Sequence, residues 1–100
     1  MGHDHPASLT AEAVLPPLNP RIAARVVNGE TLILTPHDSV LHTLNQVGTR
    51  VWELLSECGS AREVAARLAE EYEVAQEEAE TDVLALLQEF LDKQILQRVA

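Results

Sequence analysis

The residues that could do chemistry in this chain are few and scattered. His37 falls in a predicted turn and His42 on a predicted strand, and a single histidine without a partner is weak evidence of catalysis. His3-Asp4-His5 could bind a metal ion loosely, but no further ligand is visible. There is no Gly-x-Ser-x-Gly elbow and no glycine-rich phosphate loop, because the four glycines are isolated. We therefore expect no catalytic residue, no resident metal and no cofactor, and a protein that is not an enzyme.

Charge limits the partners of the chain. The net charge is −9 over 100 residues, and residues 53–92 hold twelve of the sixteen acids with only Arg62 and Arg67 as bases. A surface of this kind repels phosphate backbones and anionic lipid. We expect no nucleic-acid partner and no membrane partner. A basic or amphipathic partner is easier to accommodate.

Composition indicates one small domain in a reducing compartment. An apolar fraction of 46% is typical of a folded globule. Cys58 is the only cysteine, so an internal disulfide is excluded, and its expected role is a small apolar filler at a helix end. No apolar run is long enough to span a membrane, and the N-terminus lacks the pattern of a signal peptide. We expect a cytoplasmic protein.

A hairpin organises the first half of the chain. Asn28-Gly29 is a strong signal for a type I′ turn, because both central positions of that turn need positive φ. Apolar runs at residues 22–27 and 31–35 flank it and predict two strands. Pro36 to Ser39 turns the chain again, and Val40 to Leu44 follows as a third strand. The pattern predicts a three-stranded antiparallel meander with the third strand at its edge.

Three helices are predicted after the meander. Asn45 can cap a helix over 46–57, whose apolar stripe is Val47, Val51, Leu54 and Leu55. Ser60 and Glu63 form a capping box at the start of a second helix, and the third and longest helix covers 76–93. The fold class is α+β and winged-helix-like, a three-stranded antiparallel β-meander followed by three α-helices. Residues 1–20 are expected to form a flexible N-terminal tail, since Pro16, Pro17 and Pro20 block regular helix, and 21–97 the domain.

The predicted edge strand and the third helix suggest a binding slot. An edge strand carries unpaired N–H and C=O groups, which make it a liability or a docking site. The apolar arc of the third helix spans about 160°, wider than one packing seam needs. One flank, Leu86 and Phe90, can face the core while the other, Leu84, Leu87 and Leu91, reaches toward a groove. In the alternative, which the helical wheel alone favours, both flanks lie in the core.

The order of these elements resembles the PqqD-like family, because the hairpin precedes the helices instead of following a helix-turn-helix. The resemblance also includes Asn28-Gly29, the helix Val51-Trp52-Glu53-Leu54-Leu55, the Ser60…Glu63…Val64 helix start and the run Glu80 to Leu87. It spans about residues 20–97, and its most telling parts are Asp82-Val83 and the Leu44-Asn45 step into the first helix. The family comprises small proteins or fused domains that recognise precursor peptides of ribosomally made, post-translationally modified products.

The resemblance implies a non-catalytic peptide chaperone. Such domains bind a precursor's leader as an extra strand and present it to a modifying enzyme, which in pyrroloquinoline quinone (PQQ) biosynthesis is a radical SAM enzyme. Carried to this sequence, the strand implies peptide-binding residues Val40, Leu41, His42, Thr43 and Leu44, and the third helix implies Val83, Leu84, Leu87 and Leu91 with Glu80 at the rim. The short Pro36 to Ser39 link and the long tail depart from the usual pattern. Recognition of a peptide other than the quinone precursor therefore stays an alternative.

Two other functions fit the same elements. A winged-helix transcriptional regulator would bind DNA in a salt-sensitive way, which the acidic charge disfavours. A homo-oligomeric interaction module, such as a homodimer, would bury the edge strand and the wide apolar helix face against a copy of itself.

Overall fold

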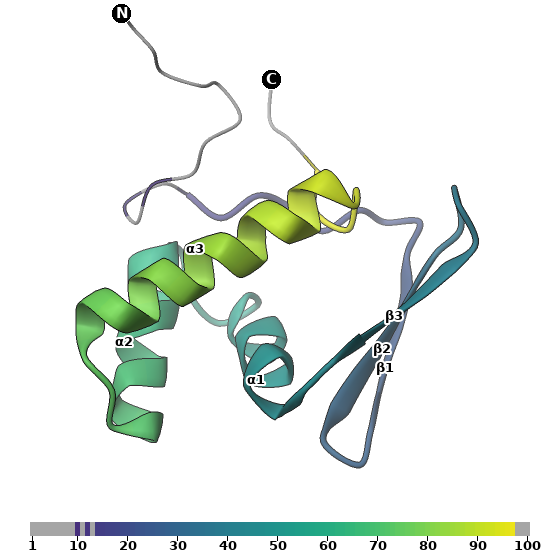
Figure 1. Cartoon of the computed structure of the whole chain (residues 1–100). Coiled ribbons are helices and arrows are strands. Elements are labelled where there is room, and N and C mark those ends of the chain that lie inside the picture. Colours follow the sequence, from purple (N-terminus) through teal and green to yellow (C-terminus); the bar gives the residue numbers. More distant parts are fainter. Residues whose placement is uncertain (1–9, 11, 13, 98–100) are drawn as a thin grey trace, which may run out of the picture.

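The computed structural model describes residues 10, 12 and 14–97, so His3-Asp4-His5 lie outside the described part. Three strands and three helices follow one another in the predicted order (Figure 1). They are β1 (Ala23–Val27), β2 (Glu30–Thr35), β3 (Val40–Leu44), α1 (Gln46–Leu54), α2 (Ala61–Tyr72) and α3 (Gln76–Asp92). The predicted α+β class, a meander followed by three helices, is confirmed.

The Asn28-Gly29 turn sets the register of the sheet. Asn28 has φ 54° and Gly29 has φ 80°, the two positive values that a type I′ turn requires. The turn pairs Val27 with Glu30, and the strand order is β1-β2-β3 with both pairs antiparallel. β3 has β2 on one side, and no described strand pairs with its other side.

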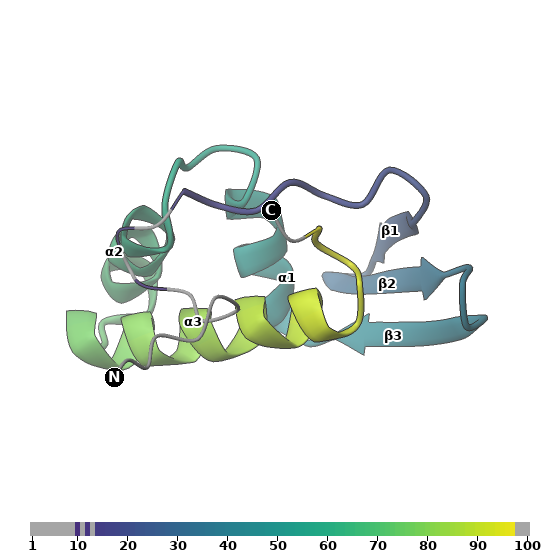
Figure 2. The same ribbon diagram turned by 90° about the horizontal axis from the view of Figure 1, so that it is seen from above.

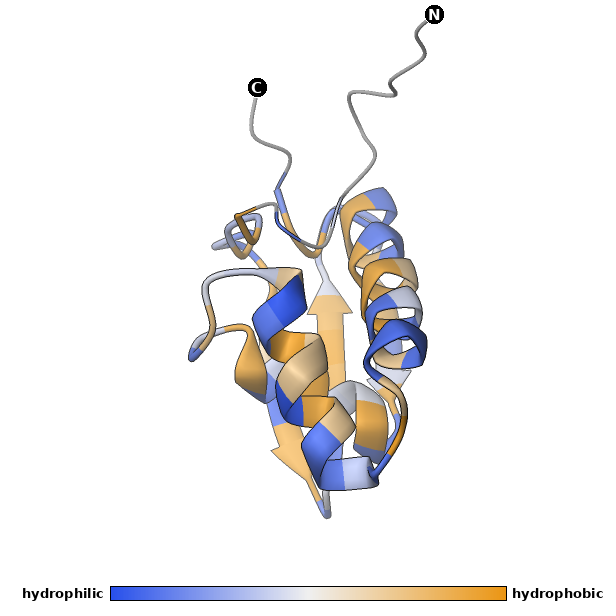
Figure 3. Ribbon diagram, turned by 90° about the vertical axis from the view of Figure 1, so that its left-hand side faces the viewer, coloured by the Kyte–Doolittle hydropathy of each residue, from blue (hydrophilic) through white to orange (hydrophobic). Residues whose placement is uncertain are grey.

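The helices all lie on one side of the sheet, which we call its inner face (Figures 1 and 2). Thr31, Ile33 and Thr35 of β2 point to that face and are fully buried. The core continues into the apolar faces of the helices, where Trp52 meets Phe90 edge-on with ring centroids 5.8 Å apart. Blue and orange segments alternate along α2 and α3 in Figure 3, as expected for amphipathic helices with one apolar face.

Residues 14–19 form an extended strap along the domain. The N–H of Leu15 donates to the Gly59 carbonyl (3.3 Å), and the N–H of Asn19 donates to the Ile95 carbonyl (2.9 Å). The strap thereby joins the α1–α2 loop to the segment that follows α3. This part of the expected flexible tail is packed against the domain.

The caps explain where α1 and α2 begin. Asn45 Oδ1 accepts the Gly48 N–H at 2.8 Å, as predicted. A Cβ at Gly48 would come within 3.2 Å of Leu44 Cβ, so glycine permits the close approach between α1 and the end of β3. Ser60 Oγ accepts the Glu63 N–H, while the Glu63 carboxylate accepts the Gly59 N–H at 2.7 Å. The capping box is thus present, except that the Glu63 carboxylate binds the N–H of the residue before the N-cap instead of the N–H of Ser60.

Candidate functional site

The free edge of β3 presents the backbone groups of alternate residues. Val27 and Glu30 flank a two-residue turn and form a hydrogen-bonded pair, after which bonded and non-bonded pairs alternate along the ladder. The backbone N–H and C=O groups of Thr31, Ile33 and Thr35 then point to β3. Their partners there are Leu44, His42 and Val40, in that order. The N–H and C=O groups of Leu41 and Thr43 consequently point away from β2, toward the free edge.

A threonine pair fixes the end of β3 against α1. Thr49 Oγ1 accepts hydrogen bonds from the Thr31 N–H (2.9 Å) and the Thr31 hydroxyl (2.8 Å). It donates in turn to the Leu44 carbonyl (3.4 Å), and both threonines are buried. The Thr31 N–H points toward β3, as the alternation requires. The pair therefore anchors the point where the edge strand enters the first helix.

A second polar cluster fixes the other end of β3. The Thr35 hydroxyl lies 2.5 Å from Asp38 Oδ1 and 3.1 Å from His42 Nε2. The hydrogen bond from Thr35 is the main cause that lowers the pKa of Asp38. Because the proton of Thr35 is directed to Asp38, its oxygen is left to accept from the His42 Nε2–H. His42 is thus held on the inner face of β3, and among the described residues no group of three or more His, Cys, Asp or Glu is placed to hold a metal ion.

Several predicted peptide-binding residues, one on β3 and three on α3, have side chains that belong to the core. Leu44, Val83, Leu87 and Leu91 are all less than a tenth exposed and pack in the main apolar cluster. The alternative in which both flanks of the α3 arc are core therefore holds for Leu87 and Leu91. These side chains can shape a groove only from beneath its surface.

The flank of α3 that carries Glu80 faces the N-terminal part of the chain. Glu80 pairs with Arg62 at the start of α2 (3.5 Å), and Arg62 pairs with Glu12 (2.6 Å). Leu84 follows Glu80 by four residues and so lies on the same side of the helix. These ion pairs turn Glu80, with half-buried Leu84 on the same side of the helix, toward the start of α2.

Leu86 occupies the opposite flank of α3, about 160° around the helix from Leu84. It is half-buried rather than fully in the core, contrary to the expectation from the wheel. α3 and the free edge of β3 lie on the same side of the molecule (Figure 2). Sequence periodicity identified both flanks of α3 but not the direction in which each one faces. The Glu80–Arg62–Glu12 ion pairs set that orientation.

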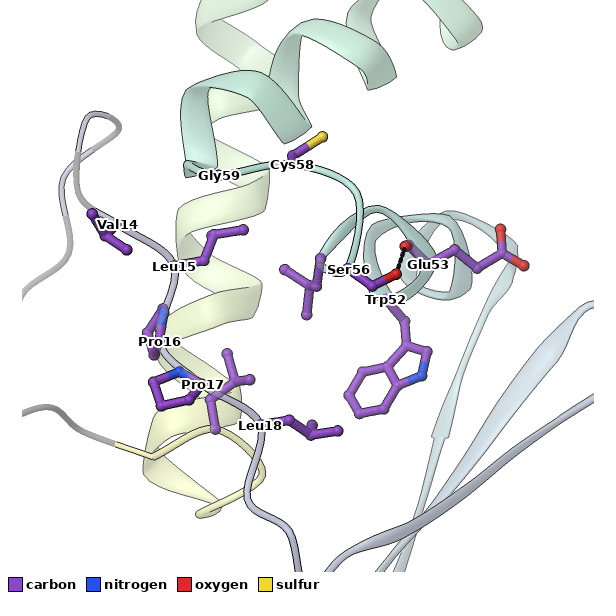
Figure 4. Close-up of a pocket in the computed structure, with 12 residues that line it drawn as sticks. Val14, Leu15, Pro16, Pro17, Leu18, Trp52, Glu53, Ser56, Cys58 and Gly59 are labelled. Carbon is purple, nitrogen blue, oxygen red and sulfur yellow. Dashed lines mark hydrogen bonds between the residues drawn. The ribbon is translucent and has the colours of Figure 1, made fainter.

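An apolar pocket of about 470 Å³ lies elsewhere, between the strap and α1 (Figure 4). Leu15, Pro17 and Leu18 form one wall, and Trp52 and Cys58 contribute to the other. Burial is the main cause that raises the pKa of the Cys58 thiol, so this cysteine is a poor nucleophile, in line with the predicted role as a filler.

Among the described residues, no helix combines the length and the apolarity needed to cross a membrane.

Comparisons with known proteins agree with this architecture. The family described as Coenzyme PQQ synthesis protein D (PqqD) matches residues 30–96. A comparison with curated proteins found no match. Among solved structures, TbiB1 in complex with the TbiA(beta) leader peptide is similar with a TM-score of 0.77 and 24% identity, over 84% of this chain and 98% of that chain.

A second similar structure is the solution NMR structure of the PqqD truncation of Methylobacterium extorquens PqqCD. It represents a functional, stand-alone recognition element for ribosomally synthesised and post-translationally modified peptides. The TM-score is 0.71 at 20% identity, over 93% of this chain and 98% of that chain. Both structures share the fold found here, and the family match covers most of the chain from β2 to the end of the core. The chain therefore belongs to the PqqD family.

Proposed function

We propose that this protein is a non-catalytic peptide chaperone that binds the leader of a ribosomally made precursor peptide by strand addition. The observation that carries the proposal is the free edge of β3, where Leu41 and Thr43 turn their N–H and C=O groups away from β2. A peptide strand aligned there gains main-chain hydrogen bonds without disturbing the sheet. Membership of the PqqD family and the leader complex of TbiB1 support the same function.

The binding site in this proposal comprises the whole of β3 and one flank of α3. Leu41 and Thr43 supply backbone groups, while Val40 and His42 line the inner side of the edge, where Val40 is 40% exposed. Leu86 forms the nearer wall of the groove, and buried Leu44, Val83, Leu87 and Leu91 support the strand and the helix from beneath. Glu80 and Leu84 lie at the far rim of α3. Alternate side chains of the leader would enter this groove.

The second partner in this proposal is the enzyme that modifies the precursor. Family membership favours a radical SAM enzyme as in PQQ biosynthesis, acting in the cytoplasm with this protein as the carrier of the leader. Leaders are disordered when free, so the ordering of the chain keeps the affinity moderate. The excess of acids on the helices favours leaders that carry Lys or Arg, through faster encounter more than through net affinity.

The proposal is tested by selecting binders from a displayed library of precursor leaders that includes the TbiA(beta) leader. A selected peptide is then titrated against the wild type and two variants. Thr43→Pro removes one outward N–H, and proline is tolerated at an edge strand where the N–H faces solvent. Thr43→Val keeps that N–H and is the matched control. We expect Thr43→Pro to weaken binding at least about tenfold, the equivalent of one lost hydrogen bond plus a steric block, and Thr43→Val to bind normally.

Equal binding by the proline variant and the wild type would contradict strand addition at β3. Circular dichroism of both variants separates loss of binding from loss of the fold.

A further inference from the structure

The outer face of the sheet carries an apolar band that crosses all three strands. The register aligns Ala23, Leu34 and Leu41 in one row across β1, β2 and β3. Leu41 is 61% exposed and Leu34 is 42% exposed. Leu32 of the next row and Val27 extend the band, and Val27 is 41% exposed. Contiguous apolar surface of this kind marks an interaction site more often than isolated apolar residues do.

None of the described elements covers this face. The three helices lie on the inner side of the sheet, and α1 packs on β2 and β3 from there (Figures 1 and 2). The strap runs along the helical part of the molecule, where it is bonded to the α1–α2 loop and to the segment after α3. The band is therefore open to a partner in the described structure.

Charge distribution favours a second copy of this chain as that partner. Residues 20–45 contain Arg21, Arg25, Glu30 and Asp38 and so carry no net charge. Residues 46–97 contain twelve acids and four bases, a net charge of −8. Two copies that met through their helices would repel each other. Two copies that meet through their sheets bring neutral surfaces together and keep the acidic helices apart.

The outer face is also self-complementary. Arg25 and Glu30 both point to it, because each sits in register with an outer-face residue, Leu32 and Val27 respectively. Neither forms an ion pair with any described residue. A twofold interface places the same patch on both sides, so Arg25 of each copy can approach Glu30 of the other. One cation and one anion beside an apolar band fit such an interface.

We propose that the outer face of the sheet, with its band of Val27, Leu32, Leu34 and Leu41, is a twofold self-association surface that leaves both β3 edges open. Sheets that pack face to face lie about 10 Å apart, perpendicular to their hydrogen-bonding direction. The Leu41 and Thr43 edge groups lie in the plane of the sheet and are not consumed. The dimer binds two leaders at once. Its interface comprises three short strands, so the association is weak and depends on concentration.

Sedimentation equilibrium of the full chain from about 1 µM to about 1 mM tests the proposal directly. We expect the average mass to rise toward that of a dimer. Leu41→Lys places a charge in the band and is expected to raise the dimer dissociation constant at least about tenfold. Val47→Lys is the matched control, since Val47 is 45% exposed but lies on α1. A wild type that stays monomeric throughout, or a Leu41→Lys variant that associates equally well, overturns the proposal.

Two further arms fix the geometry of the dimer. Arg25→Glu and Glu30→Arg are each expected to weaken association, and the double variant to restore it; failure of the double variant to restore it overturns the twofold arrangement. A selected leader peptide at saturation is expected to leave the dimer intact. Dissociation by the peptide would show that copies pair edge to edge through β3, against the outer-face assignment.

Failure of the dimer and failure of peptide binding are separable. Leu34→Lys places a charge in the same band from β2 and leaves every β3 residue unchanged, so this variant is expected to be monomeric and to bind the selected peptide as the wild type does. If the wild type is monomeric and still binds the peptide, only the self-association is wrong. If the dimer forms and no peptide binds, the proposed function fails and the dimer stands.

Discussion

Thr49 is the residue on which the position of β3 depends most. Its hydroxyl accepts two hydrogen bonds from Thr31 and donates one to the Leu44 carbonyl, all in a buried site. We expect Thr49→Val to leave the Thr31 N–H without a partner and to lower the free energy of unfolding by about 1–3 kcal/mol. Urea denaturation measures the difference. The control is Thr81→Val, where an exposed threonine bonds only its own helix, and the change should stay within about 0.5 kcal/mol.

Equal stability of the two threonine variants would contradict the role given to Thr49. The sequence alone offered no sign of this pair, because Thr31 and Thr49 are eighteen residues apart and their meeting depends on how α1 leaves β3.

The Arg50–Glu71 pair ties α1 to α2 and makes part of the stability pH-dependent. Both guanidinium contacts to Glu71 measure 2.8 Å. The hydrogen bond from Arg50 is the main cause that lowers the pKa of Glu71 below its ordinary value of 4.5. A carboxyl whose pKa is lowered by folding stabilises the protein above its ordinary pKa, and this stabilisation is lost as the pH falls through the folded value.

Glu71→Gln should therefore reduce the loss of stability below about pH 4.5, and it should destabilise the protein slightly at pH 7. Thermal unfolding at a series of pH values measures both effects. Glu70→Gln, one residue earlier and without an ion pair to any described residue, should follow the wild-type curve. A Glu71→Gln curve parallel to that of the wild type would show that the pair has no role in acid stability.

At the scale of elements, the hairpin was the most predictable part of the chain. Two positive φ values at Asn28-Gly29 are a local requirement, so the dipeptide indicated the first turn, and the turn residues Pro36 to Ser39 added the third strand that stands at the edge. Helix faces were less predictable. Val47 is 45% exposed although it matched the apolar periodicity, and it stands in the first turn of α1.

The two flanks of α3 make the proposed groove testable at this scale. Leu86 and Leu84 are both half-buried, but only the Leu86 flank lies opposite the Glu80–Arg62 contact. We expect Leu86→Lys to weaken binding of a selected leader peptide at least about tenfold and Leu84→Lys to change it little. Calorimetric titration measures both.

Leu87 is unsuitable for this purpose although the sequence indicated it as a groove residue. It is 1% exposed, so a charge there would unfold the core instead of blocking the groove. A stronger loss of binding in Leu84→Lys than in Leu86→Lys would show that the Leu84 flank of α3, and not the Leu86 flank, faces the groove.

The whole molecule separates a neutral sheet from acidic helices. The sequence already confined most acids to residues 53–92, and the structure adds that the helices formed there lie on one side of the sheet. This arrangement leaves two free surfaces on the sheet, the β3 edge and the outer face, which lie at right angles and can be used together. A carrier of leader peptides needs this freedom, because one surface holds the peptide while others meet its partners.

Amide hydrogen exchange with and without a selected leader peptide tests the central claim most directly. In the free protein the amides of Leu41 and Thr43 should exchange quickly, while that of His42, bonded to β2, exchanges slowly. Saturation with peptide should slow Leu41 and Thr43 strongly and leave His42 nearly unchanged. Peptide binding that leaves Leu41 and Thr43 unprotected, or that protects only residues around the strap and Trp52, would contradict strand addition at β3.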